Sequence, residues 1–345
     1  MYFFLFCGLI IRAQDKNLYE IHTIAFYNVE NLFDTIKDSL VFDDDYTPEG
    51  SFQWTHKRYK QKIENLAGVI AGIGKRYRKG PPDVIGLCEV ENLQVLQDLV
   101  AHPFLSSYNY GIIHQDSPDE RGIDVAMIFN KSTFLPVGIN YHSLQLLNEQ
   151  RYREYTRNQL VVHGFIDNEA VFFIVNHWPS RRGGEKRSRP FRISAAEMNL
   201  SIIDSIERVE FTPRIIGMGD FNDNPTDYTF TKVLRTKKDP LELQDQDLYN
   251  PMVPLFLKGE GSLAYRDRWS LFDQFYVSGN LRNGNAPIQV WKAGIYNSSF
   301  LTIQQGPYKG YPLRTYAGGR YTAGYSDHFP VYIYLIKQRT LLGKN

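Results

Sequence analysis

The apolar positions of this chain fall into short runs rich in β-branched and aromatic residues, separated by a few longer segments with helical spacing. The short runs predict buried strands, and they cover residues 21–27, 83–88, 123–129, 159–165, 171–176, 214–218, 271–277 and 330–335. Residues 56–75 predict a helix instead, because apolar side chains recur there three and four positions apart. Those side chains are Ile63, Leu66, Ala67, Ile70 and Ala71. Helices are also expected over residues 92–100 and 188–208.

The order of these elements predicts a single domain over residues 20–340. Strands alternate irregularly with a few long helices, and neither a repeat period nor a long linker occurs. This order is typical of mixed sheets with helices packed outside them. The length of 345 residues would also allow two domains. Residues 237–269 show no clear periodicity, so we expect them to form a long surface excursion.

The first residues predict a targeting segment. Residues 2–11 are almost entirely apolar, and Arg12 to Asp15 then turn polar. The apolar run is too short to span a bilayer, so we expect no stable membrane insertion. It is typical of a signal peptide over residues 1–13, with Ala13 at the cleavage edge, which predicts an exported protein, periplasmic or secreted. A buried N-terminal strand is the alternative interpretation.

The charges are balanced in total but segregated along the chain. Lys and Arg number 39 against 38 Asp and Glu, which argues against a uniformly basic protein that coats nucleic acid. Residues 181–192 nevertheless hold six basic residues and one acid, and residues 280–326 hold five basic residues and no acid. We expect these two stretches to bind phosphates, with a solvated helix face and a tyrosine-packed loop as the alternatives. Residues 34–49 hold six acids and one Lys, which favours a solvated loop over an extra cation site.

Polar side chains follow the predicted strands at six places. Each one alone would be explained as a turn or a cap, but carboxylates and amides at the ends of several strands converge in space, because a sheet determines where its strands end. The segments are Asn28-Val-Glu30-Asn, Leu-Cys88-Glu89, Asn176-His177-Trp-Pro, Gly-Asp220-Phe-Asn222, Asp273-Gln-Phe and Ser-Asp327-His328.

In these six segments the sequence resembles the endonuclease/exonuclease/phosphatase (DNase I-like) superfamily, and the resemblance spans residues 21–335. It implies an α/β fold, a four-layer α/β sandwich of two mixed β-sheets face to face with helices outside. It also implies hydrolysis of a phosphoester with a divalent cation, Mg²⁺ or Mn²⁺, with Ca²⁺ as a further option. Such hard cations prefer oxygen ligands.

By this resemblance, Glu89 is the principal metal ligand, with Asn28, Asp327 and Glu30 as further ligands. Asp220 is expected to act on the attacking water or the leaving oxygen, and Asn222 to donate a hydrogen bond to the phosphate.

Two histidines complete the implied catalytic set. Asp273 is expected to hold His328, since a carboxylate stabilises an imidazolium, and Asp124 to orient His177 as a second pair. The residues expected to bind phosphate are Arg157, Arg181, Arg182 and Asn176. Cys88 stands where the family often has Gln, and we interpret it as a packing residue.

The function predicted from these residues is an exported, metal-dependent, monomeric nuclease that cleaves DNA with low sequence preference. A same-fold phosphatase or phospholipid phosphodiesterase, of the inositol phosphate or sphingomyelin type, is the first alternative. A protein that binds a phosphate ligand without catalysis is the second.

Overall fold

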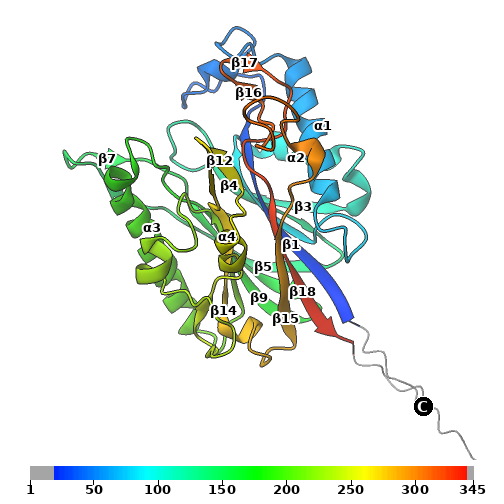
Figure 1. Cartoon of the computed structure of the whole chain (residues 1–345), viewed down its shortest axis with the longest axis vertical. Helices are drawn as coiled ribbons and strands as arrows, with labels where there is room; N and C mark the ends of the chain where they lie inside the picture. The colour runs from blue at the N-terminus through cyan, green and yellow to red at the C-terminus, as the bar shows by residue number, and fades with distance from the viewer. Residues whose placement is uncertain (1–18, 340–345) are drawn as a thin grey trace, which may run out of the picture.

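Two six-stranded mixed sheets pack face to face in the computed structural model, which describes residues 19–339 (Figure 1). The first sheet has the order β15 (Ile288–Ile295), β18 (Val331–Gln338), β1 (Tyr19–Leu32), β2 (Val84–Val90), β4 (Asp124–Asn130) and β3 (Tyr110–His114). The second has the order β11 (Leu248–Tyr249), β14 (Asp273–Ser278), β10 (Ile215–Asp220), β9 (Glu169–His177), β8 (Gln159–Ile166) and β5 (Phe134–His142). One parallel pair lies in each sheet, β1 with β2 and β9 with β10, so both sheets are mixed as predicted.

Helices cover the outer faces of the two sheets. α1 (His56–Gly72) and α2 (Leu93–Ala101) pack on the first sheet, and α3 (Glu185–Glu207) packs on the second (Figure 1). The buried face of α3 carries Ala195, Ile202 and Ile206, which belong to the same hydrophobic cluster as Phe172 and Ile174 of β9. The predicted four-layer α/β sandwich is therefore confirmed.

The two sheets approach each other closely at Gly86 of β2. A Cβ atom at this position would lie 3.0 Å from Met218 Sδ and 3.1 Å from Val175 Cγ1, on β10 and β9. Met218 and Val175 therefore point between the sheets. Because side chains alternate along a strand, the residues two positions further on, Asp220 and His177, point the same way.

The remaining elements are short. Three two-stranded pairs occur, β6 (Leu146–Leu147) with β7 (Arg153–Glu154), β12 (Leu263–Tyr265) with β13 (Arg268–Ser270), and β16 (Tyr316–Ala317) with β17 (Arg320–Tyr321). The short helix α4 covers Val253–Leu257, and single turns of 3-10 or π-helix lie at Asp44–Tyr46, Ser106–Tyr108, Thr229–Val233, Gly279–Leu281 and Ser299–Leu301. Within residues 19–339 no helix has both the length and the apolar character needed to cross a membrane. The predicted signal peptide lies outside the described residues.

The structure changes two expectations about the fold. Strands β3, β5 and β15 were not predicted from the sequence. The prediction that residues 237–269 form a surface excursion is wrong in part, because this segment contributes β11 to the second sheet and buries Leu248, Met252 and Ser262. Its elements are too short to produce a period that the sequence would reveal.

Candidate active site

Strand register brings three of the predicted catalytic residues side by side at one end of the second sheet. Asp220 on β10 pairs with His177 on the parallel strand β9 and with Asp273 on the antiparallel strand β14. Residues directly opposite one another on neighbouring strands point to the same face of a sheet. All three side chains therefore point toward the first sheet, although they lie far apart in sequence.

Asp273 and His328 form the buried pair that was expected. His328 Nδ1 lies 2.5 Å from Asp273 Oδ2, and the Ser262 hydroxyl donates to the same oxygen at 2.6 Å. Asp273 Oδ1 is buried and has no partner among the described residues. Burial alone would lower the pKa of His328, but the carboxylates of Asp273, Asp220 and Asp327 together raise it well above its usual value. This environment therefore favours the cationic form of His328.

Asp220 is buried close to this cation. Asn28 Nδ2 donates to Asp220 Oδ2 at 3.1 Å, and the backbone N–H of Asn222 donates to Oδ1 at 3.0 Å. Burial raises the pKa of Asp220 to about 7, although the His328 cation opposes this shift. A carboxyl group that exchanges its proton near neutral pH is suited to general acid–base catalysis.

His177 has the opposite electrostatic character to His328. Its Nε2 lies 3.7 Å from Asp220 Oδ2 and 3.9 Å from Glu89 Oε1, and its buried Nδ1 has no partner among the described residues. Burial, and then the positive charges of Arg157 and Arg121, lower the pKa of His177 well below its usual value. The site therefore favours the neutral form of one imidazole and the cationic form of the other.

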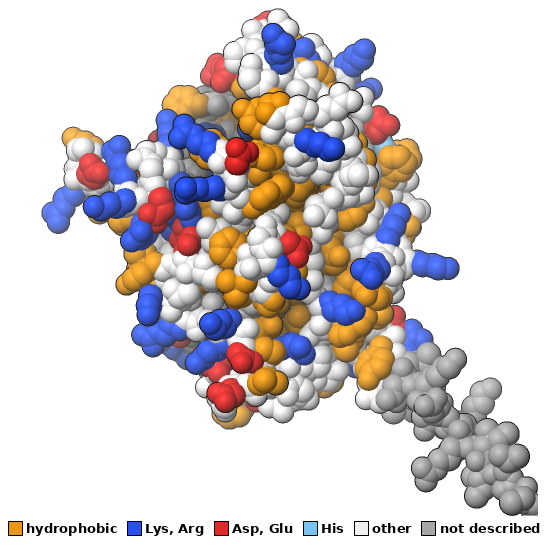
Figure 2. Space-filling model, in the orientation of Figure 1, with side chains coloured by type: hydrophobic (Ala, Val, Ile, Leu, Met, Phe, Trp, Pro, Cys, Tyr) orange, Lys and Arg blue, Asp and Glu red, His pale blue; other side chains and the backbone are white. Residues whose placement is uncertain are grey.

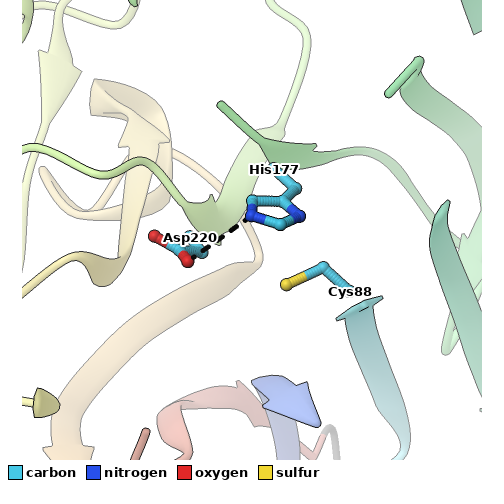
Figure 3. Close-up of side chains that lie close together, drawn as sticks. All are labelled: Cys88, His177 and Asp220. Carbon is cyan, nitrogen blue, oxygen red and sulfur yellow. Dashed lines mark ion pairs between the residues drawn. The ribbon is translucent and has the colours of Figure 1, made fainter. Parts of the chain in front are cut away.

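Cys88 lies against this pair. The side chains of Cys88, His177 and Asp220 point toward one another from the ends of β2, β9 and β10 (Figure 3), and their ligand atoms lie within 4.8 Å of one another. Burial raises the pKa of the Cys88 thiol well above its usual value. The thiolate is the form that binds metals, and burial disfavours the thiolate here. The raised pKa therefore agrees with a packing role for Cys88.

A bulge in β2 aims Glu89 into the site. The register of β2 against β4 skips Glu89, since Cys88 pairs with Val125 and Val90 with Asp124. Glu89 has a φ of +62°, which is uncommon for a residue other than Gly. In a regular strand Glu89 would point away from the face that Cys88 occupies. With the bulge, Glu89 Oε2 accepts the Asn31 N–H at 3.0 Å and Oε1 lies toward His177.

The donor atoms near Glu89 fit a hard divalent cation. Glu89 Oε1 and Asp220 Oδ2 both lie within 4 Å of His177 Nε2, Asn28 bonds Asp220, and the buried Asp273 Oδ1 lacks a partner among residues 19–339. Oxygen-rich sites of this kind suit Mg²⁺ or Mn²⁺.

Glu30, which was predicted as a further metal ligand, is bound by protein donors in the structure. Its Oε1 accepts Arg314 Nε at 3.1 Å, its Oε2 accepts the Thr315 N–H at 2.7 Å, and Lys62 Nζ lies 3.8 Å from Oε2. Both carboxylate oxygens already face protein donors. Arg314 also donates to Asp327 Oδ2 at 3.0 Å, so it links Glu30 to Asp327.

The basic stretch at residues 181–192 is neutralised to a large extent within the protein. Arg192 is fully buried and donates to Asp223 at 2.7 Å. Arg181 donates to Asp223 and Asp227 at 2.9 and 2.6 Å, and Arg189 pairs with Glu185 at 2.8 Å. The expectation that this stretch as a whole faces phosphates is therefore wrong.

Arg182 and Arg157 instead line a cavity of about 650 Å³ next to the site. Arg182 is exposed, and Lys and Arg side chains gather on this side of the molecule, near α3 and β7 (Figure 2). Arg157 is buried, donates to Asp119 at 3.1 Å and holds the carbonyl oxygen of Trp178, the neighbour of His177, at 2.8 Å.

Two predicted site residues serve other roles. Asn176 points to the opposite face of β9 from His177, where it is fully buried and bonded to Trp178 Nε1 and Asn199 Nδ2. It is an interior residue and not a phosphate ligand. Asp124 does not orient His177, because its carboxylate accepts His114 Nε2 at 3.0 Å and the Ser117 N–H at 2.8 Å.

Sequence reasoning missed Lys62 and Ser262. Lys62 lies on the buried face of α1, between Tyr59 and Leu66. A charged residue inside a helical apolar stripe is the pattern that would have identified it. Ser262 lies in the segment that was expected to be a surface excursion.

The comparisons with known proteins establish the fold and the family. A model of the endonuclease/exonuclease/phosphatase family matches residues 23–337. TDP2 of D. rerio complexed with single-strand DNA product is similar in structure, with a TM-score of 0.55 and 13% identity over 91% of this chain and 98% of that one. An endonuclease/exonuclease/phosphatase family protein from Bacteroides thetaiotaomicron has a TM-score of 0.55 and 16% identity over 94% and 100%.

A mannosyl-6-phosphatase from Bacteroides thetaiotaomicron has a TM-score of 0.52 and 16% identity, over 91% of this chain and 99% of that one. No curated protein sequence matches significantly. At these identities the structural likenesses establish the fold alone, whereas the family model covers nearly the whole described chain. This chain therefore belongs to the endonuclease/exonuclease/phosphatase family, whose members are in general metal-dependent phosphoester hydrolases.

Proposed function

We propose that this protein is a divalent-metal-dependent phosphodiesterase that cleaves DNA with low sequence preference. The observation that carries the proposal is the convergence of Asp220, His177 and the Asp273–His328 pair beside Glu89. His177, whose pKa is lowered, His328, whose pKa is raised, and Asp220, with a pKa of about 7, support the proton transfers that phosphoester hydrolysis needs.

Glu89, Asn28 and Asp327 would hold the cation, which supplies charge neutralisation at the phosphate when it is bound. Asp220 accepts a proton at a carboxylate oxygen from the water that bonds to phosphorus. The bond from phosphorus to the leaving oxygen breaks, and this oxygen takes a proton from the solvent. His328, held by Asp273 through Nδ1, donates from its other ring nitrogen to a phosphate oxygen. Asn222 uses one amide hydrogen on the Trp178 carbonyl oxygen at 3.0 Å and has a second for the phosphate.

DNA as substrate is supported by the exposed Arg182, which lines the cavity together with Arg121, Arg157 and Arg187 and with the acids Asp119, Glu120, Glu149 and Glu154. D. rerio TDP2, which shares the fold, is complexed with single-strand DNA product. A second candidate is hydrolysis of a phosphomonoester. The internal pairing of Arg181, Arg189 and Arg192 favours it, because it leaves fewer cations for a polyanion.

A substrate panel tests the proposal. Plasmid DNA, bis-p-nitrophenyl phosphate and p-nitrophenyl phosphate are each incubated with the purified protein in Mg²⁺, in Mn²⁺ and in EDTA. Asp220→Asn is compared with Asp204→Asn, the same change on the exposed face of α3. We expect diester and plasmid cleavage that EDTA and Asp220→Asn abolish and Asp204→Asn does not.

Hydrolysis of the monoester alone would favour the second candidate. The absence of turnover on every substrate with every cation would leave a phosphate-binding protein without catalysis.

We also propose that the protein is exported and monomeric. The apolar residues 2–11 and the polar residues that follow support export. Expression of the full chain in a bacterium should yield a mature protein whose first residue is Gln14, and light scattering should give the mass of one chain. Recovery from the cytoplasm with Met1 intact would contradict export.

A further inference from the structure

Lys62 is a buried charge that the mechanism above does not use. Its side chain is 1% exposed and lies on the face of α1 that otherwise carries apolar residues such as Leu66 and Ile70. Removing an ammonium group from water costs several kcal/mol unless its hydrogen bonds are replaced. The partners of Lys62 therefore indicate what it does.

Those partners lie mainly in the segment that leads to the catalytic histidine. Lys62 Nζ donates to Thr315 Oγ1 at 2.7 Å and to the carbonyl oxygen of Tyr325 at 2.6 Å. Tyr325 stands two residues before Asp327 and three before His328. The carboxylate of Glu30 is farther away, at 3.8 Å, so charge compensation of Glu30 is not the closest contact that Lys62 makes.

Other contacts join the same segment to α1 and β1. One turn further along α1, Asn65 Nδ2 donates to the carbonyl oxygens of Ala323 and Gly324 at 2.9 and 3.1 Å. The Ser326 hydroxyl donates to the carbonyl oxygen of Asn28 at 2.7 Å and accepts the His328 N–H at 3.1 Å. The segment has only the short pair β16–β17 as regular structure, so these side-chain bonds determine where it ends.

We propose that Lys62 is a positioning residue that attaches the segment 315–325 to α1 and thereby fixes Asp327 and His328 against Asp273 and β1. The proposal rests on the proposed function, since it assigns Lys62 to the same site. Lys62 acts through the backbone of this segment and not on the substrate. A displacement of about 1 Å of catalytic groups costs up to roughly a hundredfold in rate.

The test compares Lys62→Met with Lys60→Met. Methionine keeps most of the unbranched side chain, one atom shorter than lysine, and removes the three donors, and Lys60 is an exposed residue of the same helix. In nitrogen-15 NMR spectra of the metal-free protein, we expect Lys62→Met to shift the ring signals of His328 and the proton shared with Asp273, and Lys60→Met to leave them unchanged. For bis-p-nitrophenyl phosphate, we expect kcat to fall roughly tenfold to a hundredfold in Lys62→Met with little change in KM.

His328 signals identical to those of the wild type in a folded Lys62→Met protein would overturn the proposal. An activity loss that only matches a loss of folded protein would do the same. If Lys62→Met does not fold, Thr315→Val removes one acceptor with little change in volume, and the same shifts, smaller in size, are expected. The NMR experiment needs neither metal nor turnover, so a wild-type protein without phosphodiesterase activity would contradict the proposed function and leave the positioning role open to measurement.

Discussion

Strand β1 runs between two ends of the sandwich, and each end holds a buried histidine beside aspartates. The end that holds the candidate site is called the active end, and the end that holds His22 is called the distal end. The two ends differ in which polar atoms lack a hydrogen-bond partner. At the distal end, His22 Nε2 bonds Asp167 at 2.7 Å, while Asp83 accepts Arg78 and the Thr23 N–H with its two oxygens at 2.6 and 2.9 Å. At the other end, Asp273 Oδ1 is buried with no partner among the described residues, whereas a ring Nδ1 without a partner occurs at both ends, in His22 and in His177. The difference therefore lies in the carboxylates, since both oxygens of Asp83 are bonded by the protein and Asp273 keeps one oxygen available.

Backbone conformation differs between the ends in the same way. At the distal end positive φ values occur at Asp167 and Asn168, in the turn between β8 and β9, where Asp and Asn adopt this conformation readily. At the active end they occur within β1 and β2, at Glu30, Asn31 and Glu89. Strained positions of this kind persist where the surrounding structure enforces them and are common at functional sites. The comparison teaches that the same residue types serve stability at one end and catalysis at the other.

The largest expected effect distinguishes His328 at the active end from His22 at the distal end. We expect His328→Gln to lower kcat for phosphodiester hydrolysis by about 10²–10⁴ while the protein stays folded, because a group that donates to the phosphate is removed. His22→Gln should leave kcat unchanged. Steady-state kinetics and thermal unfolding of both variants would check this, and equal losses of kcat would contradict the contrast between the ends.

A smaller effect is expected from replacing Glu89, whose backbone has a positive φ. Glu89→Asn should weaken Mn²⁺ binding by at least about tenfold, because the carboxylate is lost. The same change should leave the free energy of unfolding unchanged or raise it, since Asn tolerates positive φ better than Glu. Calorimetric titration with Mn²⁺ and denaturant unfolding would measure the two effects. An unchanged affinity for Mn²⁺ would show that Glu89 is not a metal ligand.

Two neighbouring residues of β9 offer a matched pair. Asn176→Ala should destabilise the protein by about 1–3 kcal/mol, because it leaves Trp178 Nε1 and Asn199 Nδ2 without this acceptor in the interior, yet the activity of the folded protein should persist. His177→Ala should lower kcat with a smaller loss of stability. Chemical denaturation together with kinetics on the same samples would decide, and the reverse pattern would show that the two faces of β9 have been misassigned.

The smallest effect concerns the pH dependence of stability at the distal end. Burial lowers the pKa of His22, but Asp83 and Asp167 outweigh it and raise the pKa above its usual value. The folded state therefore binds the proton more tightly than the unfolded state, whose His pKa is about 6.5. The stabilisation is fully present below that pH and is lost as the pH rises through the higher folded pKa.

We therefore expect His22→Gln to lower the free energy of unfolding more at acidic pH than at pH 8 or above, by about 1 kcal/mol per unit of pKa difference. Urea unfolding of wild type and variant across this range would test it. A difference between the two proteins that does not depend on pH would show that His22 does not change its proton affinity on folding.

Most of the site was predictable because its residues follow strands in short and specific segments. His177, Asp220, Asp273 and His328 were predicted to converge, and they do. Asn176 was assigned to the wrong face, although alternation along β9 alone separates it from His177. Asp124 was paired with the wrong histidine, because nothing in its own segment indicates that the side chain of His114, at the end of β3, reaches its carboxylate.

The sequence by itself determined the fold class, the order of the main strands and helices and the family, because these depend on local periodicity and on short motifs. Only the tertiary structure decided which carboxylates are available. The Glu30 carboxylate accepts hydrogen bonds from Arg314 and Thr315, and the buried Arg192 pairs with Asp223. Lys62 bonds a segment more than 250 positions away in the chain. The physical reason is that ion pairing and burial depend on distances between distant segments, which bulges and strand register set and local patterns do not encode.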